Sequence, residues 1–235
     1  MNAWVRIIPP LIGIVLGGAV IPSVTDSSFV ADDTILSIAS GVIIGAAIGE
    51  VFPLAILENN NKASYHWVLS IGATITGLLL IESSNIIKNN SDIWDMTKMF
   101  MIDLFAASFL AGCLVDISPT SSLALSISIG FEALILANII ARQDSENENS
   151  RYLMLSILAI SVTTGFGAGR LSGRVYPKTV PIFSIVCLVV LFWTSVIEIP
   201  RQTKGRNWTS FIIGLIIASC IKFADNKIIN VSTKS

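Results

Sequence analysis

Long apolar runs separated by short polar stretches recur along the whole chain. An α-helix needs about 20 mostly apolar residues to cross a bilayer, because each residue adds about 1.5 Å along the helix axis. About eight runs approach this length, so the pattern predicts an all-α, polytopic membrane protein with about eight transmembrane helices. No connection is long enough for a second core, and residues 1–235 are expected to form a single transmembrane domain. The runs are Trp4–Ser23, Thr34–Leu57, His66–Ile87, the two halves of Lys98–Ala141, Tyr152–Leu171, Pro181–Ile199 and Trp208–Ala224.

Tryptophan residues support these boundaries, because tryptophan is enriched where a membrane meets water. Trp4, Trp67, Trp94 and Trp208 fall at predicted segment ends, whereas Trp193 lies inside the seventh run. Lysine and arginine number about eight on one side of the predicted membrane and about seven on the other, which leaves the orientation undecided.

The polar stretches between the runs are expected to be turns and linkers. They include Lys88–Lys98, Arg142–Arg151 and Ser172–Lys178. A short turn at Ser118-Pro119 is expected to divide the central stretch into two helices. The first run resembles a signal peptide in its position, but it is long and no A-x-A-like site follows, so we expect a retained helix.

Glycine recurs every four residues in the second run, at Gly41, Gly45 and Gly49. Residues four apart share one helix face, and a stripe of small residues lets another helix approach closely. The stripe therefore predicts a tight helix pair at this face. Glu50 follows the stripe directly and could bond a facing helix or gate a cavity.

Composition agrees with a membrane protein and excludes other classes. Hydrophobic residues make up 53% of the chain and charged residues only 13%, whereas soluble domains carry about 25% charged residues. The net charge of −1 offers no basic face for nucleic acid. Cys113, Cys187 and Cys220 lie far apart in apolar runs, so we expect small buried apolar side chains rather than metal ligands. The single histidine, His66, is expected to lie at the membrane interface.

Two acids lie well inside the central pair of runs, Asp103 in the first and Glu132 in the second. A carboxylate in hydrocarbon costs roughly 2.5–3.5 kcal/mol on the insertion scale, so such residues usually face a bundle interior or a polar cavity. Met99 and Ser128 each lie four residues earlier, on the same helix face as the acid. Carboxylate oxygens suit divalent cations. The competing interpretations are a protonated acid or a structural hydrogen bond between helices, and for Met99 plain apolar packing.

Enzyme motifs are absent from the sequence. It contains no G-x-S-x-G, no H-E-x-x-H and no Walker loop. We therefore expect neither catalytic activity nor a bound cofactor.

The order of these runs resembles the ZIP (Zrt/Irt-like) family of divalent-metal transporters. The second run, GVIIGAAIGEVFPLAILE, is similar to the family pattern G-x-L-L-G-D-A-F-x-H-L-L-P-E, with Glu50 at its acid and Glu58 at its final Glu. The seventh run, LFWTSVIEIP, is similar to a segment ending in E-L-L-P, with Glu198 at the Glu. The sixth run's TGFGA resembles E-P-x-G-A, with Thr164 at the acid.

The two central runs carry the most informative part of this resemblance. Both SIGFEALILA and MFMIDLFAA fit a pattern in which a histidine lies four residues before an acid. Glu132 and Asp103 take the two acids, and Ser128 and Met99 take the two histidines. The family's histidines, its Asn and its sixth-segment Glu are missing here.

The resemblance implies a 3+2+3 inverted-repeat bundle of eight helices, with both termini on one side of the membrane. Segments one to three and six to eight would be related repeats around segments four and five. It places a metal site between the fourth and fifth segments, with Asp103 and Glu132 as ligands and with Ser128, Met99 and Thr164 as auxiliary contacts.

The function expected from these features is secondary transport of a divalent metal cation. The alternatives are a non-transporting or differently specialised ZIP-like protein, and a proton-coupled carrier of another small solute. The expected partners are the lipid bilayer and the transported ion, with a homodimer left open. The expected location is multi-pass in a plasma (inner) membrane.

Overall fold

The computed structural model describes residues 3–20, 32–46, 48–49, 93–116, 119–143, 148–175, 180–194 and 208–232. Every regular element in these ranges is helical, which confirms the all-α expectation for this part of the chain. The third predicted run, at His66–Ile87, lies outside the described residues. The elements are η1 (Ala3–Ile7), α1 (Ile8–Val15), η2 (Leu16–Val20), α3 (Asp32–Ala46), α6 (Ile93–Cys113), α7 (Pro119–Gln143), α8 (Glu148–Val175), α9 (Val180–Trp193) and α11 (Trp208–Ser232).

Several helices extend beyond their apolar runs, and here the predicted boundaries were wrong. Helix α6 begins five residues before Lys98, within the expected linker, at Ile93. Helix α8 takes in parts of both flanking stretches, from Glu148 to Val175. Lysine, arginine and glutamate are good helix formers, so a helix continues after its apolar part ends. The expected turn between the central helices is confirmed, since α7 begins at Pro119, the residue type favoured in a first helical turn.

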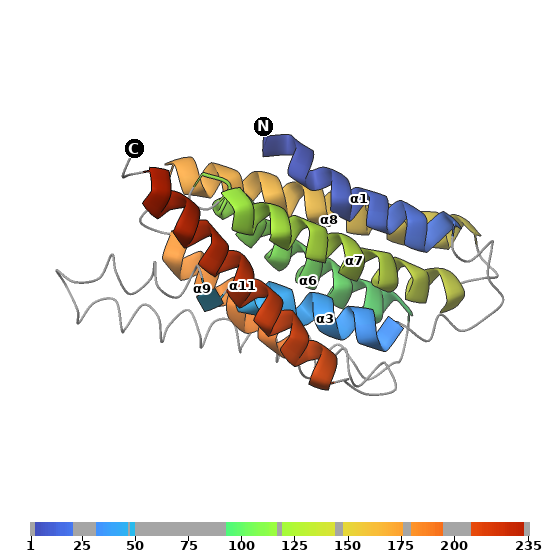
Figure 1. Ribbon diagram of the computed structural model, residues 1–235. Helices are drawn as coiled ribbons and strands as arrows, with labels where there is room; N and C mark the ends of the chain where they lie inside the picture. The colour runs from blue at the N-terminus through green and yellow to red at the C-terminus, as the bar shows by residue number, and fades with distance from the viewer. Residues whose placement is uncertain are drawn as a thin grey trace.

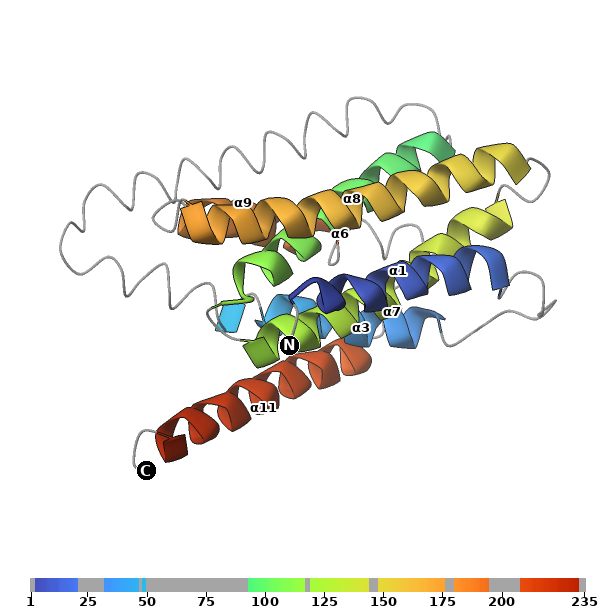
Figure 2. The same cartoon turned by 90° about the horizontal axis from the view of Figure 1, so that it is seen from above.

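The described helices form two groups that meet at α6 and α7. Helices α8 and α9 pack on α6, whereas α1 and α3 pack on α7 and α11 packs on α3 (Figures 1 and 2). Helices α1 and α7 run in one direction along the bundle, and α6 and α8 run in the other (Figure 1). The first and last described helices have their outer ends, at the two chain termini, toward the same end of the bundle (Figure 1).

Glycine allows three of these helix pairs to approach closely. A Cβ atom on Gly17 would collide with the backbone of Leu134, and one on Gly169 would lie 3.0 Å from Cα of Phe109. The predicted glycine stripe of α3 is confirmed for two members. A Cβ on Gly41 would collide with the backbone of α11, and one on Gly45 would lie 2.7 Å from Cβ of Ala218.

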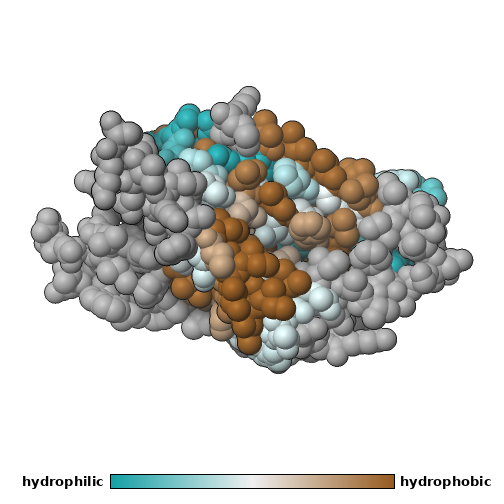
Figure 3. All heavy atoms as spheres, viewed as in Figure 1, coloured by the Kyte–Doolittle hydropathy of each residue, from teal (hydrophilic) through white to brown (hydrophobic). Residues whose placement is uncertain are grey.

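Many large apolar side chains lie on the described surface, and a set of polar side chains lies inside the bundle. Large hydrophobic side chains are exposed along α1, α8 and α11, and they gather over α1 and α11 in Figure 3. Several serines, Thr97, Thr194, Asn138 and both central acids are buried. Among the described residues, Pro119–Arg142 and Glu148–Val175 are helices long and apolar enough to cross a membrane.

Candidate functional site

Asp103 and Glu132 meet in the middle of the bundle. Each side chain is completely buried, at 0% exposure. They come from α6 and α7, and the two carboxyl groups lie close enough to interact with each other. Two carboxylates buried side by side repel each other, which makes it costly for both to be ionised. We therefore expect the pair to hold one proton and to carry one negative charge.

Thr194 is a third member of this site, and the sequence analysis missed it. It follows α9 directly and is buried, and its hydroxyl donates a hydrogen bond to Oδ1 of Asp103. The hydroxyl oxygen of Thr194 also lies 3.0 Å from the carbonyl oxygen of Val190, one turn earlier in α9. Threonine inside an apolar helix commonly bonds its own backbone in this way. A hydroxyl in the run LFWTSVIEIP was therefore no clear signal of a site.

Ser128 and Met99 lie on the predicted faces, one turn before each acid. The Ser128 hydroxyl is buried and donates to the carbonyl oxygen of Ala124 at 3.0 Å. Met99 is partly buried and packs against the main apolar core. In this arrangement Ser128 would have to turn its hydroxyl away from Ala124 in order to bind an ion.

Thr164 is not brought to the acid pair. It is exposed on α8, and its hydroxyl donates to the carbonyl oxygen of Ile160 at 2.7 Å. Ser161 of α8 does face α6, and its hydroxyl donates to the carbonyl oxygen of Met101 at 2.5 Å. Three other acids suggested by the resemblance lie outside the described residues, namely Glu50, Glu58 and Glu198.

The pair is enclosed by large apolar side chains. Phe100 and Leu104 flank Asp103 along α6, and Ile129 and Leu136 flank Glu132 along α7, all with at most 1% exposure. Charges interact strongly in such surroundings, because little water screens them. A cavity of about 140 Å³ lies between α3, α7 and α11, but neither acid lines it. The described arrangement is therefore closed around the acids.

Buried hydroxyl groups lead from the acid pair along the α6–α7 interface. Ser122 of α7 donates to the carbonyl oxygen of Ala111 at 2.7 Å, and Ser126 donates to that of Ser122 at 2.8 Å. The buried hydroxyl of Ser108 has no hydrogen-bond partner in the part of the chain that the structure describes. This interface therefore contains buried hydroxyl groups as well as apolar side chains.

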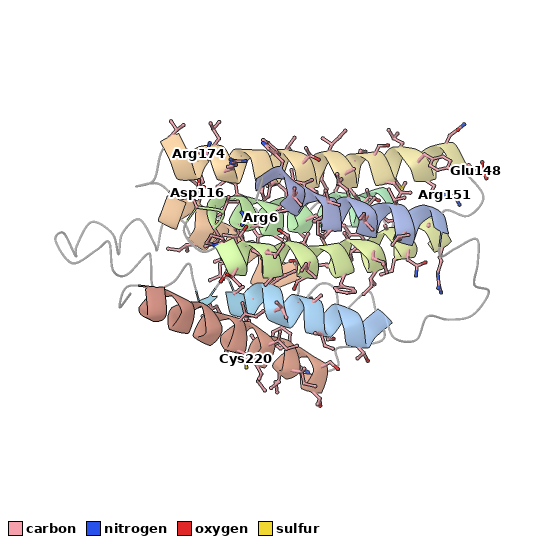
Figure 4. All side chains as sticks on the ribbon, turned by 45° about the horizontal axis from the view of Figure 1, so that its top comes forward. Arg6, Asp116, Glu148, Arg151, Arg174 and Cys220 are labelled. Carbon is pink, nitrogen blue, oxygen red and sulfur yellow. The ribbon has the colours of Figure 1, made fainter. Side chains whose placement is uncertain are left out.

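The donors gathered here are oxygen atoms. Among the described residues, no cluster of three or more His, Cys, Asp or Glu side chains is arranged so that it could hold a metal ion. Two carboxyl groups and a hydroxyl suit a hard cation that keeps some of its water, rather than a soft ion held by thiolates. Two cysteines lie away from this site. Cys113 donates to the carbonyl oxygen of Gly169 at 3.4 Å. Cys220 was expected to be buried, but it is exposed (Figure 4), because its face of α11 points out of the bundle.

No family model matches the sequence, and no curated protein does.

Proposed function

We propose that this protein is a ZIP-like secondary carrier that moves a divalent metal cation across a membrane. Asp103 and Glu132 would bind the cation between the fourth and fifth of eight spans, with Thr194 fixing the orientation of Asp103. The observation that carries the proposal is the meeting of two completely buried acids from consecutive helices. Such acids inside a membrane mark ion pathways by default.

Charge balance favours a divalent cation as the passenger. No lysine or arginine lies within four positions of Asp103 on α6 or of Glu132 on α7. A proton held by the pair, together with the Thr194 hydroxyl, would stabilise the two acids when no ion is bound. A divalent ion would replace the proton and neutralise both carboxylates, which lowers the cost of carrying the ion through hydrocarbon.

The distribution of charge along the bundle supports a membrane location. Arg6, Asp116 and Arg174 lie at one end, and Glu148 and Arg151 lie at the other (Figure 4). Helix α8 has 28 residues, which corresponds to about 42 Å at 1.5 Å per residue and exceeds a hydrocarbon core of about 30 Å. The apolar surface between the charged ends would face lipid.

The packing around the two acids supports an inverted repeat. Gly13 of α1 and Gly17 of η2, which follows α1 directly, lie against Gly130 and Leu134, which precede and follow Glu132 by two positions. Helix α8 repeats this relationship at the other acid. It places Ser161 and Gly165 against Met101 and Phe105, which precede and follow Asp103 by two positions. The contacts of α1 with α7 are therefore equivalent to those of α8 with α6. A 3+2+3 bundle whose repeats are related by a twofold axis requires this equivalence.

The test is cation flux into vesicles that contain the purified protein. Mg²⁺, Mn²⁺, Fe²⁺, Co²⁺ and Zn²⁺ are offered in turn to the wild type and to the double variant Asp103→Asn/Glu132→Gln. The control is Glu148→Gln, which removes an exposed acid at the end of α8. We expect saturable flux of at least one ion in the wild type and the control, and none in the double variant. Full flux in the double variant would reject the site, and no flux of any ion would favour a non-transporting protein.

A second candidate function is proton-coupled transport of another small solute. The closeness of two buried carboxyl groups favours it, because such a pair can take up and release a proton. The same vesicles distinguish the two functions. Inward proton movement without saturable uptake of any divalent ion would favour the second.

A further inference from the structure

Three arginines lie close together at the end of the bundle that carries the chain termini. Arg6 lies in η1, and Arg170 and Arg174 lie one turn apart on α8. Arg6 is 7% exposed, and its guanidinium interacts electrostatically with both Arg170 and Asp116. Figure 4 shows Arg6, Asp116 and Arg174 at this end.

The positive charges at this end exceed the negative charge that the described residues supply. Asp116 is already engaged, since the Nε atom of Arg174 lies 3.2 Å from its Oδ2. Arg6 and Arg170 repel each other. Burying two like charges side by side is costly unless an anion lies between or beside them.

Donor groups on two of these arginines lack partners. Arg6 donates through Nη2 to the carbonyl oxygen of Pro119 at 3.2 Å, but its buried Nε has no partner in the described ranges. The buried Nη1 of Arg170 also has none there. Buried polar groups without partners are rare in proteins, and an absent ligand is one reason for them.

The position of these donors fits the headgroup region of a bilayer. The Arg170 guanidinium lies over the Trp4 ring, 5.6 Å from its centre, and Trp4 is half exposed. Tryptophan at a helix end is typical of the membrane interface, and clustered arginines there attract anionic lipids. Arginine also presents a fork of donors that matches phosphate oxygens.

We propose that Arg6, Arg170 and Arg174 form a binding site for the phosphate group of an anionic phospholipid. This inference rests on the membrane location proposed above, but it does not depend on which ion is carried. The phosphate oxygens would accept hydrogen bonds from Arg6 and Arg170. The lipid would thereby tie the start of α1 to the end of α8, which are the two outer helices that flank the acid-bearing pair.

The experiment measures lipid retention rather than transport, so its failure is separate from failure of the carrier proposal. The purified protein is placed in nanodiscs of phosphatidylcholine with increasing phosphatidylglycerol, and bound lipid is counted by native mass spectrometry. A parallel arm supplies inorganic phosphate in pure phosphatidylcholine. Arg170→Gln is the main variant, because Arg170 is only partly buried, whereas Arg6→Gln would also remove the bond to Pro119. Arg170→Lys keeps the positive charge but removes the fork of guanidinium donors. Arg142→Gln is the control, because it removes an arginine from the opposite end of the bundle.

We expect the wild type and Arg142→Gln to retain phosphatidylglycerol preferentially. Arg170→Gln should bind it roughly fivefold more weakly, as the loss of one arginine near an anionic headgroup predicts, and Arg170→Lys should show an intermediate affinity. If the wild type binds inorganic phosphate as well as it binds phosphatidylglycerol, and Arg170→Gln weakens both to the same extent, the site is supported with soluble phosphate as its ligand. Identical lipid retention in the wild type and Arg170→Gln would overturn the proposal.

Discussion

Thr194 at the end of α9 donates a hydrogen bond to Oδ1 of Asp103 in the middle of α6, across 91 positions of sequence. Asp103 in turn contacts Glu132 of α7. Three helices therefore converge on one pair of carboxyl groups. A movement of α9 relative to α6 would change the hydrogen bonding of Asp103, which links helix position to ion affinity.

The first prediction concerns this hydroxyl. Thr194→Val keeps the side-chain shape but removes the donor, and a hydrogen bond to a charged group contributes about 1.5–3 kcal/mol. We expect cation affinity at neutral pH to fall by at least about tenfold, measured as the concentration for half-maximal vesicle uptake. Thr194→Ser should retain most of the affinity. Thr164→Val is the matched control, because the Thr164 hydroxyl bonds only its own helix in the described contacts; an equal loss in both valine variants would contradict a specific role for Thr194.

The second prediction concerns pH. If a divalent ion replaces the proton shared by Asp103 and Glu132, ion binding releases a proton, and protons compete with the ion. Affinity should therefore fall as pH falls, by about tenfold per pH unit where one proton is displaced per ion. Equilibrium binding of the ion is measured at a series of pH values, and a pH-sensitive dye follows the proton that is released when the ion binds. An affinity that stays constant across the series would show that the ion binds without displacing the shared proton.

The third prediction tests the close packing of α8 on α6. A Cβ atom on Gly169 would lie 3.0 Å from Cα of Phe109 and closer still to its carbonyl group. Gly169→Ala should therefore destabilise the protein by about 1–3 kcal/mol, the usual cost of overpacking. Gly167 lies two residues earlier on the same helix, where a Cβ would meet only a Trp4 ring atom at 3.9 Å. Gly167→Ala should instead stabilise the helix by up to about 1 kcal/mol. Thermal unfolding of both variants in the same detergent checks this. A change of melting temperature in the same direction for both variants would contradict the packing.

The fourth prediction tests whether α8 spans the membrane. Glu148→Cys and Arg174→Cys are introduced separately into a chain in which Cys220 is replaced by serine, because Cys220 is exposed. A membrane-impermeant maleimide added to sealed vesicles of uniform orientation should label one variant from outside and the other only after the vesicles are opened. Labelling of both variants from the same side would contradict a single crossing by α8.

The sequence identified the helices and the acid pair because both give strong signals. Apolar runs near 20 residues mark the spans, and Asp103 and Glu132 interrupt two of them where a charge is costly. Thr194 gave no such signal, since a threonine can satisfy its hydroxyl within its own helix. Thr164 was suggested only by its place in a resemblance, and the structure turns it outward. Helix ends were misplaced at Ile93 and Val175 because charged residues continue a helix after its apolar part has ended.

The most direct test is to locate the ion itself. Crystals of the protein saturated with Mn²⁺, or with whichever transported ion gives an anomalous signal, should show one difference peak between the carboxyl groups of Asp103 and Glu132. The peak should disappear in Asp103→Asn/Glu132→Gln. A protein that transports the ion but, when saturated with it, shows its peak elsewhere and none between the two carboxyl groups would contradict the account.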